Sequence, residues 1–197
     1  METKDFKLTT EAIKQANQYL KSLSPTEIVK WCLQLGEKAI VTTNFRPYEG
    51  AILHACVSVY PNITVVWCDT GYNTPNTYQC AEKLISELDL QIDLFVPKNT
   101  VAHRNVTLGI PAIDAPEHLE FTNQVKLEPF ARAMAKHQPE LWFTNMRKGQ
   151  TTLRDSLTII SVTKDGVINI SPFYPCDATE IHLQMAKISL RNYRTSS

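Results

Sequence analysis

The sequence predicts an α/β fold, a mostly parallel, twisted sheet flanked by helices. Two observations lead to this class. Short apolar runs rich in β-branched residues, such as KAIVT (38–42) and NITVVWC (62–68), alternate with longer segments of helical periodicity. Each run is followed by a polar turn and then by a helix-like segment. This βαβ order brings successive strands parallel to one another, because the helix returns the chain to the same edge of the sheet.

Composition predicts an ordinary soluble globular protein with a single domain. The chain has 197 residues, of which 43% are hydrophobic, enough for one sizeable core. Its 20 basic and 20 acidic residues balance, so no general field would attract nucleic acid or a membrane surface. The N-terminal residues lack the apolar core of a signal peptide, and no apolar run reaches the ~18 residues of a membrane span. We therefore expect a cytoplasmic protein.

The N-terminal half is expected to hold two helices and then alternating strands and helices. Residues 10–23 repeat apolar side chains on one helical face, Ser24-Pro25 interrupts them, and residues 25–35 form a second helix that ends at Gly36. The predicted order after Gly36 is strand 38–42, helix 51–60, strand 63–68, helix 75–88 and strand 92–96.

The second half is less uniform. Residues 97–122 include two prolines and are predicted to be an irregular connection, either a lid over a site or a poorly ordered insertion. A helix at 127–137 and a short strand at 141–144 follow. Residues 158–163 and 167–170 are expected to pair as a hairpin, because the Asp-Gly between them is a hairpin turn signal.

Two polar turns follow predicted strands. WCDTGYNTPNTY (67–78) carries Asp69 and Gly71, and TTNFRPYEG (42–50) carries hydroxyls, an amide and Arg46. The carboxyl ends of parallel strands meet at one edge of a sheet, where α/β proteins bind ligands. We therefore expect both turns to line one crevice.

A basic cluster follows the strand at 141–144. Arg147, Lys148 and Arg154 lie within eight residues, with Gln150 and two threonines among them. Such cations bind phosphate or sulfate, and the free N–H groups of a helix that begins near Gln150 would add to the attraction. A solvated basic turn, with Arg154 paired to a carboxylate, would have the same composition. Both interpretations stay open on this segment alone.

The three strand ends together offer one acid and two sets of anion-binding groups. This combination suits a nucleotide that carries phosphate or sulfate, because the acid can bind hydroxyl or amino groups. The sequence contains neither GxGxxG nor GxxxxGK[ST], so the usual dinucleotide-binding and P-loop solutions are excluded. Five cysteines without CxxC spacing signal no zinc site and no disulfide framework.

Four segments follow one another in a distinctive order: TTNFRPYEGAIL, WCDTGYNTPNTY, KLEPFARAM and MRKGQTTLRDSL. In this order they resemble the modified PP-loop, the Asp-Thr-Gly loop, the Lys-x-x-Pro-Leu helix and the Arg-x-x-Gln-x-x-x-Arg signature of the phosphoadenylylsulfate (PAPS) reductases. These enzymes belong to the adenine-nucleotide alpha-hydrolase, or PP-loop, superfamily. The resemblance implies a Rossmann-like fold. The expected organisation is N-terminal helices at 1–36, a nucleotide-binding core at 37–181 and a short tail at 182–197.

The resemblance also implies roles for individual residues. The nucleotide-binding loop would contain Thr43, Asn44, Phe45 and Arg46. The wall near the nucleoside would contain Asp69, Thr70 and Gly71. The phosphate or sulfate end would be held by Arg147, Lys148, Gln150 and Arg154. Arg46 stands in the place of a family glycine, where it would either crowd the loop or add a cation to it.

The implied reaction is reductive. In the family, a thiolate attacks the sulfur of the sulfonucleotide and forms an enzyme thiosulfonate, from which thioredoxin or glutaredoxin releases sulfite. The family's nucleophile lies in a C-terminal Glu-Cys-Gly-Leu/Ile-His motif, which these 197 residues do not contain. The catalytic residue is therefore unknown. Cys68 and Cys176 are the candidate substitutes, although free cysteines are more often packing residues.

No metal or iron–sulfur cluster is expected. The paired cysteines of iron–sulfur relatives are replaced here by Phe121-Thr122. Relatives often form homodimers, although the sequence itself carries no dimer signal.

Three functions stay open. A sulfonucleotide reductase would bind PAPS or adenylylsulfate (APS) and release sulfite, with thioredoxin as a partner. An inactive module would bind an adenine nucleotide without turnover. Another PP-loop-type transferase or hydrolase would consume ATP. We take the reductase as the prediction, because the resemblance spans most of the chain.

Overall fold

The computed structural model describes residues 8–46, 48–146, 158–177 and 179–186. The strands are β1 (Ala39–Thr43), β2 (Thr64–Cys68), β3 (Gln91–Phe95), β4 (Leu141–Phe143), β5 (Ile160–Val162) and β6 (Ile168–Ile170). The helices are α1 (Thr10–Leu20), α2 (Pro25–Cys32), α3 (Glu49–Val59), α4 (Pro75–Leu88), α5 (Val101–Thr107), α6 (His118–Thr122), the π-helix η1 (Asn123–Leu127) and α7 (Glu128–His137). Residues 179–186 are also helical.

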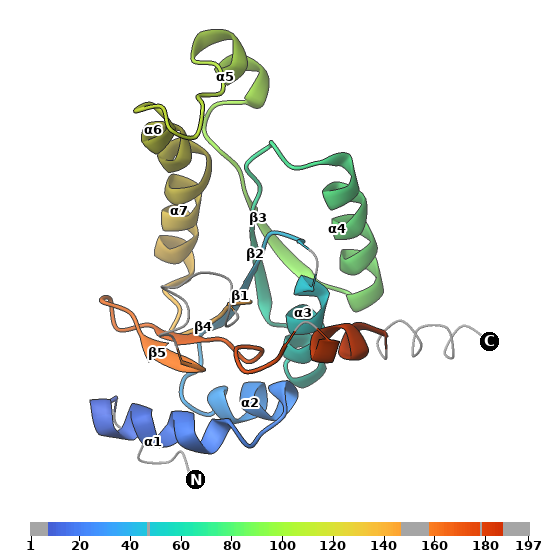
Figure 1. The fold of residues 1–197 in the computed structure, drawn as a ribbon, viewed down its shortest axis with the longest axis vertical. Coiled ribbons are helices and arrows are strands. Elements are labelled where there is room, and N and C mark those ends of the chain that lie inside the picture. Colours follow the sequence, from blue (N-terminus) through green and yellow to red (C-terminus); the bar gives the residue numbers. More distant parts are fainter. Residues whose placement is uncertain (1–7, 47, 147–157, 178, 187–197) are drawn as a thin grey trace, which may run out of the picture.

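Within these ranges the strands form one six-stranded sheet with the order β3-β2-β1-β4-β6-β5 (Figure 1). Each neighbouring pair is parallel except β5 and β6, which form the predicted antiparallel hairpin. The turn of that hairpin uses Gly166 at φ 83°, a left-handed conformation that favours glycine. The predicted α/β class with a mostly parallel sheet is confirmed.

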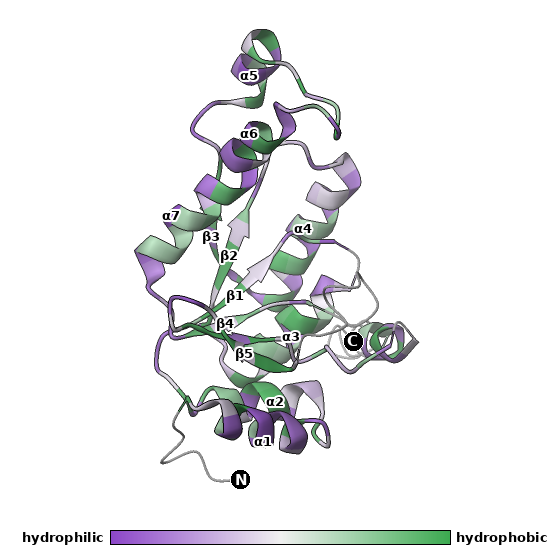
Figure 2. Ribbon diagram, turned by 60° about the vertical axis from the view of Figure 1, so that its left-hand side comes forward, coloured by the Kyte–Doolittle hydropathy of each residue, from purple (hydrophilic) through white to green (hydrophobic). Residues whose placement is uncertain are grey.

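The sheet separates two apolar layers. Side chains alternate between the faces of a strand, so Val41 and Val65 pack into the main core with α2 and α3, whereas Ile40 and Val66 pack with Ala133 of α7 on the other face. In Figure 1, α4 and α7 accordingly lie on opposite sides of the strands. Figure 2 shows the apolar residues gathered in the strands and in α3. In the described part of the chain, α7 packs on the central strands on this side of the sheet.

The prediction of an irregular connection at 97–122 is wrong in part, because α5 and α6 form there. Thr100 caps α5, since its Oγ1 accepts a hydrogen bond from the backbone N–H of His103 at 3.2 Å. α6 continues through η1 into α7 as one helical run. Pro129 has no N–H to donate to the preceding turn, which accounts for the widened π-helical turn just before it. The segment containing α5 and α6 projects beyond the carboxyl end of β3 (Figure 1).

Asn17 of α1 protects the outer edge of the sheet. Its buried side chain donates to the carbonyl of Ile160 at 2.9 Å and accepts from the N–H of the same residue at 2.9 Å. The amide thus pairs with β5 as a neighbouring strand would. An unpaired edge strand invites association with other chains, so this contact stabilises the edge and blocks that association.

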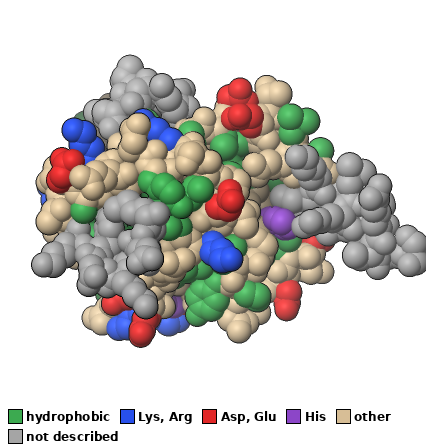
Figure 3. Space-filling model, turned by 90° about the horizontal axis from the view of Figure 1, so that it is seen from below, with side chains coloured by type: hydrophobic (Ala, Val, Ile, Leu, Met, Phe, Trp, Pro, Cys, Tyr) green, Lys and Arg blue, Asp and Glu red, His purple; other side chains and the backbone are tan. Residues whose placement is uncertain are grey.

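The surface carries no concentration of one charge on the face drawn in Figure 3, where acidic and basic side chains of the described residues are interspersed with apolar ones. This distribution agrees with the balanced composition of the chain. Over the part of the chain that the structure describes, no helix is long and apolar enough to cross a membrane.

Candidate functional site

A cavity of about 420 Å³ opens at the carboxyl ends of β1 and β4, beside α7. From β1 the chain proceeds outward to β2 and β3, and it later returns to place β4 on the other side of β1. This reversal of strand order leaves a crevice beyond the strand ends, where open α/β sheets bind ligands. The position of the cavity therefore follows from the topology of the sheet.

The turn after β1 forms one wall of the cavity. Thr43 Oγ1 and the backbone N–H of Asn44 each donate to Oε2 of Glu49, both at 2.6 Å. The N–H of Phe45 donates to Thr43 Oγ1 at 3.0 Å, with Phe45 at φ 51°. Glu49 begins α3, and only 9% of it is exposed. A buried carboxylate therefore holds the turn together from the helix that follows it.

Two aromatic rings also line the cavity. Phe130 of α7 and Trp142 of β4 have ring centroids 5.0 Å apart at an angle of 42°. A hydrogen bond fixes the indole ring of Trp142, because its Nε1–H donates to Thr42 Oγ1 at 3.0 Å. The pair offers a broad apolar surface next to polar groups, an arrangement that suits a planar heterocycle.

Cationic and polar groups complete the lining. Arg46 and Lys126 contribute positive charge from the β1 turn and from η1. Thr144 and Asn145 follow β4, and Oδ1 of Asn145 is buried without a hydrogen-bond partner among the residues described. Because buried polar atoms are nearly always paired, this oxygen is a candidate acceptor for a ligand group.

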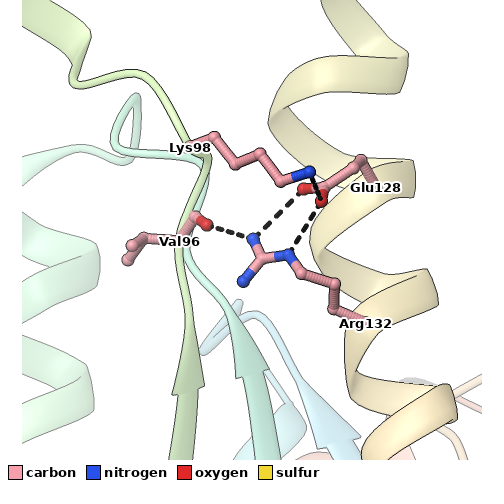
Figure 4. A network of polar contacts seen from close by, with 4 residues as sticks. All are labelled: Val96, Lys98, Glu128 and Arg132. Atoms are coloured by element: carbon pink, nitrogen blue, oxygen red, sulfur yellow. Dashed lines mark hydrogen bonds and ion pairs between the residues drawn. The ribbon is translucent and has the colours of Figure 1, made fainter.

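An ion-pair network fixes the start of α7 against the strand ends (Figure 4). Arg132 donates to both carboxylate oxygens of Glu128, at 2.8 and 3.1 Å, and to the carbonyl of Val96 at 2.5 Å. Lys98 Nζ lies 3.1 Å from Glu128 Oε1. The hydrogen bond from Arg132 is the main reason that the pKa of Glu128 lies below its ordinary value. The network holds in place the helix that carries Phe130.

Asp69 organises its own loop and does not line the cavity. Its Oδ1 accepts from the backbone N–H of Gly71, from the side-chain amide of Asn73 and from the hydroxyl of Tyr78, at 2.8–3.0 Å. Burial and the bond to Asp69 raise the pKa of Tyr78. Gly71 has φ 77°, and a Cβ there would overlap Cγ2 of Val101 in α5. The loop is therefore tightly packed against the α5 segment.

The predicted site residues divide into three groups. Thr43, Asn44 and Arg46 line the cavity. Phe45 is 2% exposed and packs edge-to-face on Trp67 at 4.8 Å, so its side chain belongs to the core. Residues of the Asp69 loop lie outside the lining: Asp69, Thr70 and Gly71. The predicted anion-binding residues Arg147, Lys148, Gln150 and Arg154 lie outside the described residues.

The lining residues that sequence reasoning missed include Glu49, Lys126, Phe130, Trp142 and Asn145. Lys126 and Phe130 both belong to KLEPFARAM, so a signal for them was present. Trp142 is indistinguishable in the sequence from an ordinary strand residue. Glu49 also gives no signal of a site in the sequence, because an acid in the first turn of a helix is common.

The two candidate thiols differ in their position relative to the cavity, but the pKa of each is raised. Cys68 lines the cavity, whereas Cys176 does not. Burial raises the pKa of Cys68 to about 11, although Arg132 and Lys126 act in the opposite direction. Burial, with nearby carboxylates, raises the pKa of Cys176 to about 11. Both thiols are therefore protonated at neutral pH in this structure.

The α5 segment, for which a lid was one of two predicted roles, contributes no residue to the cavity wall. Its one buried cation, Arg104, lies over the ring of Phe121 at 5.7 Å and donates to Gln124 Oε1. This guanidinium holds α5 to η1. In the described ranges, no three histidine, cysteine or acidic side chains are grouped so that they could hold a metal ion.

Comparisons with known proteins identify the family of this chain. Residues 38–190 match the model of the phosphoadenosine phosphosulfate reductase domain. The chain is 29% identical over 182 residues to the phosphoadenosine 5'-phosphosulfate reductase of Photorhabdus laumondii, covering 91% of this chain and 74% of that one. It is 32% identical over 175 residues to the Vibrio cholerae enzyme, with 88% and 69% covered. The crystal structure of the PAPS reductase from Candida auris has the same fold, with a TM-score of 0.80 at 24% identity, covering 93% and 88%. The chain therefore belongs to the phosphoadenosine phosphosulfate reductase family.

Proposed function

We propose that the protein binds an adenine sulfonucleotide, PAPS or APS, in the cavity between β1, β4 and α7 and reduces it to sulfite. The observation that carries this proposal is the composition of the cavity wall. An aromatic pair, Phe130 and Trp142, and two cations, Arg46 and Lys126, line one cavity of about 420 Å³. This volume is within the usual range for ligand sites, about 300–1,000 Å³.

Each part of such a nucleotide has a counterpart in the wall. The rings of Phe130 and Trp142 suit the adenine base. Oδ1 of Asn145, which has no partner among the described residues, can accept from an amino or hydroxyl group. Arg46 and Lys126 can balance phosphate and sulfate charge. The Candida auris relative is a phosphate complex, which supports anion binding by this fold.

The proposed chemistry is a two-electron transfer from thiols. A thiolate attacks the sulfuryl sulfur, the sulfur–oxygen bond to the nucleotide breaks, and the nucleotide leaves as its phosphate. A dithiol such as reduced thioredoxin then attacks the thiosulfonate, releases sulfite and becomes a disulfide. Both electrons come from the dithiol, so the proposal requires no iron–sulfur cluster or metal. Cys68 is the described thiol that lines the cavity.

A second candidate function is binding without turnover. The raised pKa values of Cys68 and Cys176 favour it, because a thiol that is protonated at neutral pH is a weak nucleophile. In that case the cavity would sense or sequester the nucleotide.

The test is sulfite release from PAPS, and separately from APS, in the presence of reduced thioredoxin. The proposal expects one sulfite for each thioredoxin oxidised, with activity reduced in Lys126→Ala and retained in Lys83→Ala. Lys83 is a matched control because its side chain is exposed on α4, away from the cavity. Loss of activity in Cys68→Ser, but not in Cys176→Ser, would identify the nucleophile. Bound but unreduced nucleotide would establish the second function, and hydrolysis of ATP would contradict both.

A further inference from the structure

We propose that Glu49 is an internal anion that occupies the donors of the β1 turn and competes for them with the phosphate or sulfate of the ligand. The turn is the segment from Thr43 to Arg46 that connects β1 towards α3. This inference deepens the proposed function and rests on it, because it concerns the same cavity.

The hydrogen bonds of Glu49 are those that an anionic ligand would make. One carboxylate oxygen, Oε2, accepts from a hydroxyl, Thr43 Oγ1, and from a backbone N–H, that of Asn44. Turns after strands bind phosphates through this combination of hydroxyl and backbone N–H groups. Both distances are 2.6 Å, as expected when the acceptor is charged. The donors of the turn are thus already bound to an anion that belongs to the protein.

Glu49 has no ion-pair partner among the residues that the structure describes. It is 9% exposed and lies in the cavity wall. In the described part of the chain, the ion pairs formed by lysine, arginine and histidine involve other carboxylates. A buried carboxylate without a cation is costly, and its hydrogen bonds offset that cost. A second anion at the same donors would be repelled, because like charges a few ångströms apart interact strongly where water is excluded.

Two consequences follow for ligand binding. A phosphate or sulfate can reach the turn only when the Glu49 side chain moves away from it, so part of the binding free energy is lost in breaking two short hydrogen bonds. Groups that bind elsewhere in the cavity, such as an uncharged nucleoside, do not meet this competition. Glu49 would therefore set how strongly the cavity discriminates between anionic and neutral ligands.

Two measurements on variants of Glu49 separate this role from a purely structural one: the stability of the free protein and its affinity for anions. Both variants should lower the stability of the free protein, because Glu49→Gln replaces the charged acceptor of the turn by a weaker, neutral one and Glu49→Ala removes it. The same variants should bind anions more tightly. A residue that only supports the turn would lower both stability and affinity, because the donors would no longer be held in place.

The experiment is calorimetric titration of wild type, Glu49→Gln and Glu49→Ala with inorganic phosphate, PAPS and adenosine, together with urea unfolding. The expected result is a gain in affinity of about tenfold or more for phosphate and PAPS, with little change for adenosine. Glu11→Gln is the matched control, because Glu11 is an exposed acid in the first turn of α1. This substitution should leave the affinity for phosphate, PAPS and adenosine unchanged.

The possible outcomes distinguish this inference from the proposed function. If wild type binds PAPS and both variants bind it equally or more weakly, the competition is refuted and the proposed function stands. If wild type does not bind PAPS while the variants bind inorganic phosphate, the competition is supported and the proposed function is contradicted. If neither wild type nor the variants bind any anion, both are overturned.

Discussion

Replacing Gly71 by alanine tests the packing of the Asp69 loop on α5. Two separate costs are expected. A residue other than glycine at φ 77° costs about 1–2 kcal/mol, because its Cβ approaches its own backbone. The same Cβ would overlap Val101 Cγ2, and forcing an extra methyl group into a packed site costs about 1–3 kcal/mol. Gly71→Ala should therefore lower the free energy of unfolding by about 2–5 kcal/mol.

Gly109 provides a matched control for the backbone part of this cost. It has φ 68°, but a Cβ there would meet no atom within 4 Å. Gly109→Ala should therefore show only the left-handed backbone cost, about 1–2 kcal/mol. The difference between the two glycine variants measures the contact with Val101.

The assay is urea unfolding of wild type, Gly71→Ala, Val101→Ala and the double variant, with the melting temperature as a second measure. For a chain of this size a loss of 2 kcal/mol lowers Tm by at least about 4 °C. Shortening Val101 should remove the overlap, so the double variant should be more stable than the sum of the single changes predicts, by about 1 kcal/mol or more. Strict additivity, or equal effects of the two glycine variants, would refute the close approach of the loop and α5.

Three further predictions concern stability and reactivity. Asn17→Ala should lower the free energy of unfolding by about 1–3 kcal/mol, because the N–H of the buried Ile160 loses its side-chain acceptor and the carbonyl keeps only the hydrogen bond from the hydroxyl of Thr158; no change in urea unfolding would contradict the edge contact. Burial alone would raise the pKa of Asp93, but hydrogen bonds from a lysine and a histidine of α7 hold it below its ordinary value. The stability that Asp93 contributes should be complete above the unfolded pKa of about 3.9 and be lost as the pH falls below it, so urea unfolding of wild type and Asp93→Asn should converge in acid. Iodoacetamide at neutral pH should modify the exposed Cys80 well before Cys68, whose pKa is raised to about 11. Mass spectrometry of the digested protein measures the order of modification, and modification of Cys68 first would contradict the prediction.

The first two strands were predictable because each is a short apolar run with polar or turn residues at its ends. KAIVT and NITVVWC correspond to β1 and β2 within a residue or two. α5 was not predictable in the same way. It has only seven residues, and its stability comes from the Thr100 cap and from contacts of Arg104 with Phe121 and Gln124. Those partners follow it in the chain by about twenty residues, so local periodicity does not reveal them.

The sequence predicted the position of the site in the fold, but it did not predict all of the residues that line the site. Topology alone directed Thr43, Asn44 and Arg46 to the carboxyl edge of the sheet, where the cavity lies. Asp69 also follows a strand, but the donors of its own loop surround its carboxylate. A sequence shows that an acid follows a strand, but it does not show which donors reach that acid first. Trp142 enters the cavity only because β4 pairs with β1, a long-range contact.

The central claim is that the cavity between β1, β4 and α7 binds an adenine sulfonucleotide. The most direct test is calorimetric titration with PAPS of wild type, Lys126→Ala and Lys83→Ala. Lys126 lines the cavity, whereas Lys83 is exposed on α4, so both variants lose one positive charge but only one loses it at the site. We predict saturable binding to wild type, weakened about tenfold or more in Lys126→Ala and unchanged in Lys83→Ala. Absence of PAPS binding to wild type, or an equal loss in both variants, would contradict the claim.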